Sequence, residues 1–195
     1  MLTSAFDVDE VNALIRLLHE QGVSYLMGSD RLSRKEEAIN PVHLLQRLAA
    51  CNYPLVENAI ISLLLLHPEL AFSVETALQE SEPDLAENLA VVTLATLYLQ
   101  QWWFFRLACA LGQLPCFPEE PFPSLWEDRD LPPPSSGYGR DGFLALQSYQ
   151  QRRYCVPLNF LADWQNQIEH LLAQEEAHQH QLSPDAWKAL CQQIA

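Results

Sequence analysis

The sequence predicts an all-α fold, a bundle or short array of about eight helices with one long proline-rich loop. The first observation is the pacing of Pro41, Pro54, Pro68 and Pro83, which stand 13, 14 and 15 residues apart. Each proline precedes helix-like sequence, and proline suits the first helical position because that position needs no amide donor. The second observation is that apolar residues recur at helical spacing between these prolines. Together the two predict short helices joined by tight corners.

Length and composition predict one domain with a sizeable core. The chain has 195 residues, of which 49% are hydrophobic, and that fraction excludes a disordered protein. We expect a single helical domain over residues 1–195, with helices in 1–112, a proline-rich segment in 113–139 and further helices in 140–195.

Two helices are predicted before residue 50. The first runs from Val8 to Gln21 and ends at Gly22, a residue type that commonly follows the last helical turn. The apolar stretch Val23–Met27 then suggests a short strand. The second helix begins at Pro41, because the side chain of Asn40 can cap the first turn.

Three helices follow, and the last of them is the longest. The helix after Pro54 carries Ile60–Leu65, which is apolar nearly all round and therefore predicts a central, buried position. The next helix is expected over Glu69–Gln79. A long hydrophobic helix is expected from Asp84 to Leu111, and its last third contains an aromatic run of four consecutive residues, Trp102–Phe105.

A membrane span is the alternative interpretation of this hydrophobic stretch. Leu89–Leu111 is long enough to cross a bilayer, but it contains Gln100, Gln101 and Arg106. These side chains are costly in hydrocarbon, whereas a helix buried in a bundle tolerates them where they reach partners. We therefore expect no membrane partner.

The composition changes abruptly between Gln113 and Gly139. Seven of the thirteen prolines lie in this segment, and no helical periodicity survives. The interleaved Phe117, Phe122 and Trp126 argue against disorder, because buried aromatic side chains can hold an extended chain in place. We expect the segment to be ordered and to pack across the end of the long helix, against its aromatic residues.

The remaining sequence predicts three more helices, Asp141–Tyr154, Pro157–Gln174 and Pro184–Ile194. The second has apolar residues at i, i+3 and i+4 on one face, and Ser183 caps the third. The piece Ala173–Gln181 is rich in Gln, Glu and His, so we expect an exposed turn or a frayed helix end.

The net charge and the cysteine pattern limit the kinds of partner and the cellular location that we expect. The net charge is −14, and the chain has two lysines. Such a balance repels nucleic-acid phosphates, so no direct nucleic-acid partner is expected, and it favours solubility or a basic protein partner. The five cysteines lack CxxC spacing, a pattern typical of reduced, buried thiols in a cytoplasmic protein. No signal-peptide pattern is found near Met1.

No pattern of catalytic, cofactor-binding or metal-binding residues emerges from the sequence. Glu175 and His178 have the i, i+3 spacing of di-iron bundles, but such sites need a second pair, which the chain lacks. A GxSxG motif and a recognisable cysteine nucleophile are also missing. The sequence therefore disfavours an enzyme and predicts no cofactor and no metal. An enzyme of unknown class, built from the polar loops, stays an alternative.

The aromatic run that ends the long helix is the most informative functional feature. Consecutive helical residues are about 100° apart, so four in a row point all around the axis and cannot share one core. At least one of them must contact the proline-rich segment or a partner protein. The candidate partner-binding residues are Trp102, Trp103, Phe105, Phe122, Trp126, Arg152 and Arg153. We predict a non-catalytic protein-interaction module that is a monomer or a homodimer.

The segment Asn40–Ala71 adds a resemblance. Its Pro41, Leu44-Leu45, Arg47-Leu48 and Leu66-His67-Pro68-Glu69-Leu70 are similar to those of small helical bacterial proteins that accompany nucleotidyltransferase-like partners in toxin–antitoxin-type modules. The resemblance covers about a sixth of the chain. It implies an alternative role as the neutralising or accessory member of a toxin–antitoxin or defence pair, with a nucleotidyltransferase-like protein as the partner.

Overall fold

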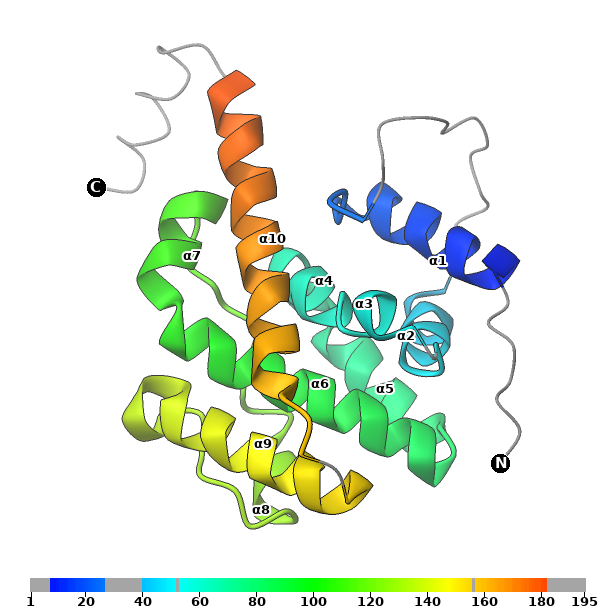
Figure 1. Cartoon of the computed structure of the whole chain (residues 1–195), viewed down its shortest axis with the longest axis vertical. Helices are drawn as coiled ribbons and strands as arrows, with labels where there is room; N and C mark the ends of the chain where they lie inside the picture. Colours follow the sequence, from blue (N-terminus) through cyan, green and yellow to red (C-terminus); the bar gives the residue numbers. More distant parts are fainter. Residues whose placement is uncertain (1–7, 27–39, 52, 156, 182–195) are drawn as a thin grey trace.

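The long helix α6 (Pro83–Trp102) forms the centre of the fold, and most of the other helices pack on it (Figure 1). The computed structural model describes residues 8–26, 40–51, 53–155 and 157–181. Every regular element within these ranges is helical, so the predicted all-α class is confirmed. Residues 89–100 of α6 are all buried, which requires neighbours on every side of that helix.

The two N-terminal helices begin and end where local signals predict. Helix α1 (Val8–Glu20) is followed by Gly22, whose φ of 85° is the left-handed conformation that glycine adopts most readily. Helix α2 (Pro41–Ala49) starts on its proline, and the Asn40 side chain accepts a hydrogen bond from the Val42 amide at 2.9 Å.

Prolines start the next elements as well. Pro54 and Pro68 each occupy the first position of an element, as predicted. The single helix expected after Pro54 is divided in the structure, and the two parts meet at Asn58 and Ala59. The second part is buried over Ile60–Leu65, as its apolar composition predicts. The elements are α3 (Pro54–Glu57), α4 (Ile60–Leu66), the 3₁₀ turn η1 (Pro68–Leu70) and α5 (Ala71–Glu80).

The prediction of one helix from Asp84 to Leu111 is wrong, because the chain breaks at Trp103. This residue has φ −101° and ψ 14°, and a separate helix, α7 (Phe104–Leu111), follows it. Neither proline nor glycine stands at the break. The break redirects the chain so that α7 packs against α10, a tertiary contact that helical periodicity does not reveal (Figure 1).

The proline-rich segment is ordered and is anchored along α6. Buried Gln100 holds the backbone of Phe117 twice: its Nε2 donates to the carbonyl at 2.8 Å, and its Oε1 accepts from the amide at 3.1 Å. The Tyr98 hydroxyl donates to the Pro132 carbonyl at 2.8 Å. Phe117 also stacks on Phe122, with 5.6 Å between ring centroids. These anchors precede the aromatic run, so the segment lies closer to the start of the long helix than expected. It contains α8 (Pro123–Glu127) and the 3₁₀ turn η2 (Ser136–Gly139).

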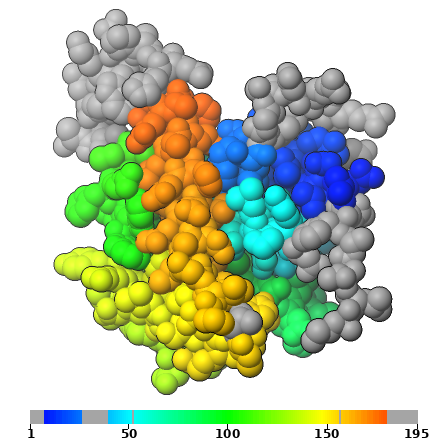
Figure 2. All heavy atoms as spheres, viewed as in Figure 1, coloured from blue at the N-terminus to red at the C-terminus, as the bar shows by residue number. Residues whose placement is uncertain are grey.

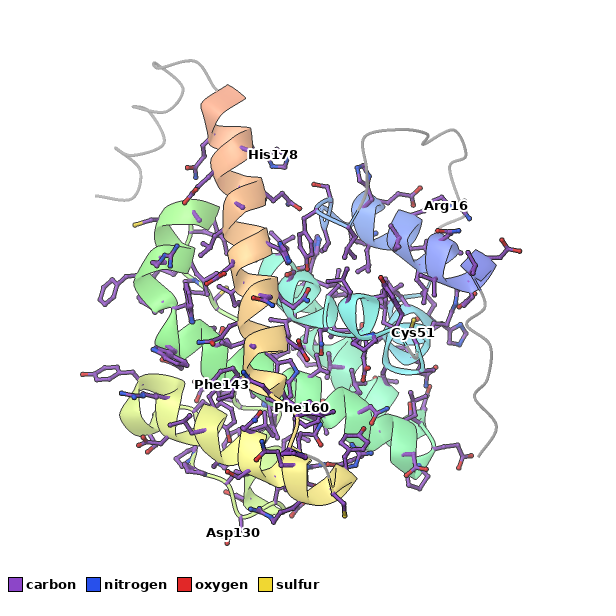
Figure 3. All side chains as sticks on the ribbon, viewed as in Figure 1. Arg16, Cys51, Asp130, Phe143, Phe160 and His178 are labelled. Atoms are coloured by element: carbon purple, nitrogen blue, oxygen red, sulfur yellow. The ribbon has the colours of Figure 1, made fainter. Side chains whose placement is uncertain are left out.

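Helix α9 (Arg140–Tyr154) packs directly on α6. Gly142 lies so close to the Tyr98 ring that a Cβ atom there would come within 2.0 Å of it. A larger residue at this position would separate the two helices. Phe143, the next residue, points toward the junction of α9 with α10, where Phe160 also lies (Figure 3).

Helix α10 (Phe160–Gln181) crosses over α4, α6 and α7 (Figure 1). Of the two alternatives expected for residues 173–181, the turn is wrong, because this stretch is helical and two of its glutamines bond to the backbone of other segments. Gln174 Nε2 donates to the Gly22 carbonyl at 2.7 Å, and Gln179 Nε2 donates to the Ala110 carbonyl at 2.7 Å. The helix expected over 184–194 lies outside the described residues.

Two further expectations are corrected by the structure. Residues 23–26 form no strand, because the Ser24 and Tyr25 amides donate to Gln174 Oε1 instead of to a neighbouring strand. The thiols of Cys109, Cys116 and Cys155 are exposed and not buried.

Within the described ranges, no single helix is long and apolar enough to cross a membrane. The stretches Pro54–Leu66 and Pro68–Glu80 meet that length and composition only as a pair, bent by 108°.

Candidate functional site

The aromatic run is divided between the core and the surface. Phe105 is 82% exposed, and Trp102 is 38% exposed with its ring edge-on to Phe143 at 5.6 Å. Trp103 is half-buried, and the Arg106 guanidinium lies over its ring at 4.7 Å. The break at Trp103 therefore leaves Phe105 as the most exposed member of the run.

Two of the predicted partner-binding aromatics pack on the core, one of them fully buried. Phe122 is 1% exposed, and Trp126 packs against the hydrophobic core. Both side chains hold the proline-rich segment to the helices; Phe122 adds nothing to the surface, whereas Trp126 is partly exposed.

The two arginines near the end of α9 have different environments. Arg152 is exposed. Arg153 is half-buried, donates to Asn88 Oδ1 at 3.1 Å and lies over the Tyr154 ring at 5.0 Å. Arg153 is therefore engaged within the fold, and Arg152 is the one whose charge faces solvent.

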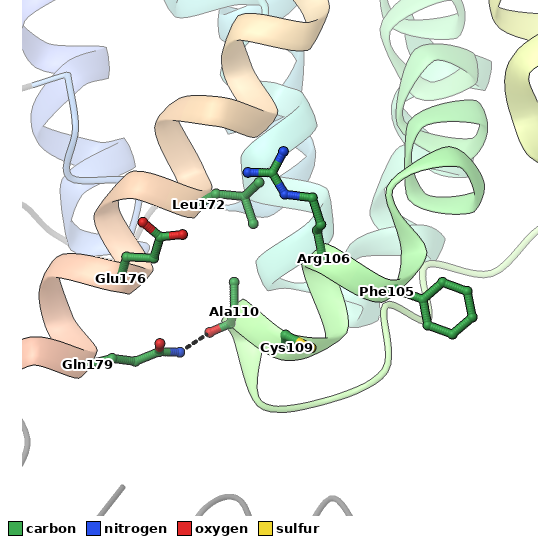
Figure 4. Close-up of a pocket in the computed structure, with 7 residues that line it drawn as sticks. All are labelled: Phe105, Arg106, Cys109, Ala110, Leu172, Glu176 and Gln179. Carbon is green, nitrogen blue, oxygen red and sulfur yellow. Dashed lines mark hydrogen bonds between the residues drawn. The ribbon is translucent and has the colours of Figure 1, made fainter. Parts of the chain in front are cut away.

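A groove of about 400 Å³ lies between α7 and α10. Phe105 stands at its rim and points away from the helix, whereas Arg106 and Leu172 approach each other across it (Figure 4). The remaining lining residues are Cys109, Ala110, Glu176 and Gln179. The groove thus has an apolar floor, an aromatic rim and one carboxylate.

A smaller and more polar pocket, of about 260 Å³, lies on the other side of α10, against α3. Figure 2 shows this face of the molecule, with α10 (orange) between α7 (green) and the α3–α4 stretch (cyan). Amide side chains line the pocket from both helices: Asn58 from the end of α3, and Asn166 and Gln167 from α10. Asn58 and Gln167 are more than nine-tenths buried.

A third polar cluster joins α6 to α8 and α9. Glu87 forms an ion pair with Arg129 and accepts a hydrogen bond from the Tyr149 hydroxyl at 2.7 Å. Burial alone would raise the pKa of Glu87, but the hydrogen bonds from Arg129 and Tyr149 outweigh it and lower the pKa. The groups satisfy one another, so the cluster has the character of a structural ion pair.

Nearby Glu57 is less well compensated. Burial raises the pKa of Glu57 to about 7, and the charge of Arg153 offsets only part of this effect. Burial also raises the pKa of the Cys51 thiol, which therefore stays protonated at neutral pH.

The described residues offer no group of three His, Cys, Asp or Glu side chains that could hold a metal ion. The Glu175 and His178 side chains approach to 3.6 Å, a pairing of neighbours on one helix face.

Comparison with known proteins returned no matching family model, no matching curated protein and no matching solved structure.

Sequence patterns did not reveal several surface features. Phe72, on α5, is 77% exposed, and Tyr138, next to α9, is 81% exposed. The polar pocket was missed because Asn58 and Gln167 are far apart in sequence and sit in helices whose apolar residues dominate the pattern. A buried amide among apolar neighbours was the one signal that could have pointed to them.

Proposed function

We propose that this chain is a non-catalytic protein-interaction module that binds a partner protein through α7 and the groove between α7 and α10. The observation that carries the proposal is the exposure of Phe105 at the rim of an apolar groove. Large aromatic side chains beside a hollow are typical anchors of protein interfaces.

The energetics support a binding role for this surface. Covering a fully exposed phenylalanine contributes about 1.5–3 kcal/mol. The floor residues Leu172 and Ala110 would add further apolar contact, whereas Glu176 would face a basic group. Arg106 keeps its positive charge over the Trp103 ring, so a basic group of the partner would have to lie beside Glu176 and away from Arg106.

The occupant is a segment of a partner protein with an apolar side and basic residues. Net charge supports this choice, because a chain of net charge −14 attracts a basic surface and speeds its association. The described part of the groove brings only one formal positive charge, that of Arg106.

The test uses two matched phenylalanines. The partner is first identified by co-purification and then expressed alone, so that the Kd of the binary complex is measured by calorimetry. Phe105→Ser should weaken binding about tenfold or more, because an interface anchor is lost. Phe72→Ser removes an equally exposed ring on α5 and should leave the Kd unchanged. Equal effects of the two substitutions would contradict the proposal.

The same variants separate other occupants of the groove. A change in oligomeric state with Phe105→Ser, measured by light scattering, would show that the surface joins two copies of this chain. Tighter partner binding after deletion of residues 182–195 would show that the C-terminal segment competes for the groove. The first outcome overturns the proposal, and the second supports it.

A neutralising or accessory role in a toxin–antitoxin pair is a narrower form of this proposal. It rests on the resemblance of Asn40–Ala71, and it names a nucleotidyltransferase-like protein as the partner. Co-expression of such a protein from a neighbouring gene provides the test: wild-type chain should restore growth, and Phe105→Ser should not. If both the wild-type chain and Phe105→Ser restored growth, the α7 surface would not be the one that neutralises the toxin.

A further inference from the structure

The polar pocket between α3 and α10 is separate from the interaction surface just described, because it lies on the other side of α10. Its volume of about 260 Å³ is sufficient for a small molecule of one or two rings. Apolar walls come from Pro54 and Leu55, and polar groups converge from α10.

Two carboxamides in this pocket lack partners for their hydrogen-bonding groups. The Asn58 side chain makes no hydrogen bond to any described residue, although it is 8% exposed. The Nε2 group of Gln167 is likewise unbonded within the described residues, and this side chain is 2% exposed. Both side chains therefore keep hydrogen-bonding groups that reach the cavity, where a ligand can replace water as their partner.

The orientation of Gln167 is set by a small network behind the pocket. Its Oε1 accepts a hydrogen bond from the Tyr25 hydroxyl at 2.7 Å, and the Ser62 hydroxyl lies 2.9 Å from that of Tyr25. Burial raises the pKa of Tyr25, so its hydroxyl stays a neutral donor. Gln167 Oε1 keeps one lone pair and its Nε2 group keeps its N–H donors, and Asn58 likewise offers both a donor and an acceptor.

Planar rings flank the amides. His170 lines the pocket and stacks on Tyr25, with 5.3 Å between centroids and 20° between planes. Tyr25 itself does not line the pocket, so the imidazole lies between Tyr25 and the cavity. A flat ligand can extend such a stack.

The charge of the pocket selects against anions. None of its lining residues is Lys or Arg, and Asp163 supplies the one carboxylate. A phosphate or carboxylate group would meet this negative charge without a compensating cation.

From these observations we infer that the pocket binds a small, uncharged, planar heterocycle with adjacent hydrogen-bond donors and acceptors on one edge, namely a free nucleobase or its nucleoside. Asn58 and Gln167 pair with that edge, as carboxamides pair with base edges generally. His170 contributes stacking, and the lack of a cation excludes the corresponding nucleotide.

Calorimetry on the full chain tests the inference with adenine, cytosine, guanosine, adenosine and AMP. At least one base or nucleoside should bind with a Kd below about 1 mM, and AMP should bind at least tenfold more weakly than adenosine. Equal binding of base and nucleoside would place the ribose outside the pocket, whereas tighter nucleoside binding would place it inside; either supports the inference.

Two substitutions localise the binding. Asn58→Leu removes the unbonded amide and should weaken binding about tenfold without loss of thermal stability. Asn166 is exposed, and Asn166→Trp should abolish binding because the larger side chain fills the mouth of the cavity. This second variant keeps the test valid if Asn58→Leu fails to fold. The matched control is Asn12→Leu, on exposed α1 surface, which should bind as wild type does.

Three outcomes would overturn the inference: no binding of any base or nucleoside, equal binding of AMP and adenosine, or wild-type affinity in both pocket variants. All of these measurements use the isolated chain, so they are independent of whether the α7 surface binds a protein.

Discussion

The two proline-rich regions of this chain use proline in opposite ways. In residues 41–83, four prolines stand at the starts of α2, α3, η1 and α6, and an apolar helical pattern follows each of them. In residues 113–139, seven prolines stand close together, and the backbone is held by side chains of α6. In the second region only Pro123 starts a helix, the five-residue α8, because no apolar helical pattern follows the other prolines.

The two regions are therefore stabilised by different kinds of interaction. The first region is stabilised by burial of helix faces, as in α4, where Ile60–Leu65 are buried. The second depends on a few anchors, Phe117 and Phe122 inside the core and Gln100 across from the segment backbone. Single substitutions should therefore have large effects on the second region and small effects at the prolines of the first.

The largest effect is expected from Phe122→Ala. Loss of a fully buried ring that stacks on Phe117 should lower the free energy of unfolding by about 3–5 kcal/mol. Urea unfolding gives this value, and limited proteolysis should show faster cleavage within residues 113–139. Phe72→Ala, at an exposed site, is the control. A loss below about 1 kcal/mol in the Phe122 variant would show that the second region does not depend on this anchor.

Gln100→Leu should lower the free energy of unfolding by about 2–4 kcal/mol, because it leaves the buried amide and carbonyl of Phe117 without partners. The matched control is Gln101→Leu. Gln101 donates to the Glu119 side chain at 2.7 Å, and both groups can be rehydrated, so the expected loss is under about 1 kcal/mol. Equal losses would show that the pairing with Phe117 is not the anchor.

The third prediction concerns Glu57 in the first region. Its pKa is about 7 in the folded state against 4.5 as the reference value, so the folded protein retains a proton that the unfolded chain releases between these pH values. Stability should therefore fall as the pH rises from 4.5 to 7. Glu57→Gln cannot ionise, and it should be more stable than wild type by about 1–3 kcal/mol at pH 8.

Urea unfolding at pH 4.5 and pH 8 measures this difference, and the exposed Glu80→Gln is the control. The two proteins should have similar stability at pH 4.5, because Glu57 is then largely protonated in the folded state. A difference in the free energy of unfolding between Glu57→Gln and wild type that is the same at both pH values would contradict the prediction.

The smallest effect is expected at the helix-starting prolines. Pro54→Ala or Pro68→Ala should change the free energy of unfolding by less than about 1 kcal/mol, since the first helical position needs no amide bond and only unfolded-chain entropy changes. A loss of several kcal/mol would show that the corners depend on proline itself, and the contrast between the two regions would disappear.

Local chemistry in the sequence was sufficient for much of the fold. The Asn40 cap, the Gly22 stop and the positions of Pro54 and Pro68 depend on neighbouring residues only, so they could be predicted. Helix ends set by distant contacts could not. The break at Trp103 and the extension of α10 through Gln179 follow from the packing of α7 on α10 and from the Gln179–Ala110 hydrogen bond.

The same division applies to the candidate sites. The run of four aromatic residues indicated by itself that at least one ring must leave the core, because helical geometry separates neighbouring side chains by about 100°. Tertiary structure decided which rings those are: Phe105 is exposed, whereas Phe122 is buried under the segment that it anchors. The polar pocket depended on tertiary structure entirely, since Asn58 and Gln167 meet only where α10 crosses α3. Spacing along the chain carries no information about a contact made across such a distance, and burial of the two amides becomes costly only once the helices have packed.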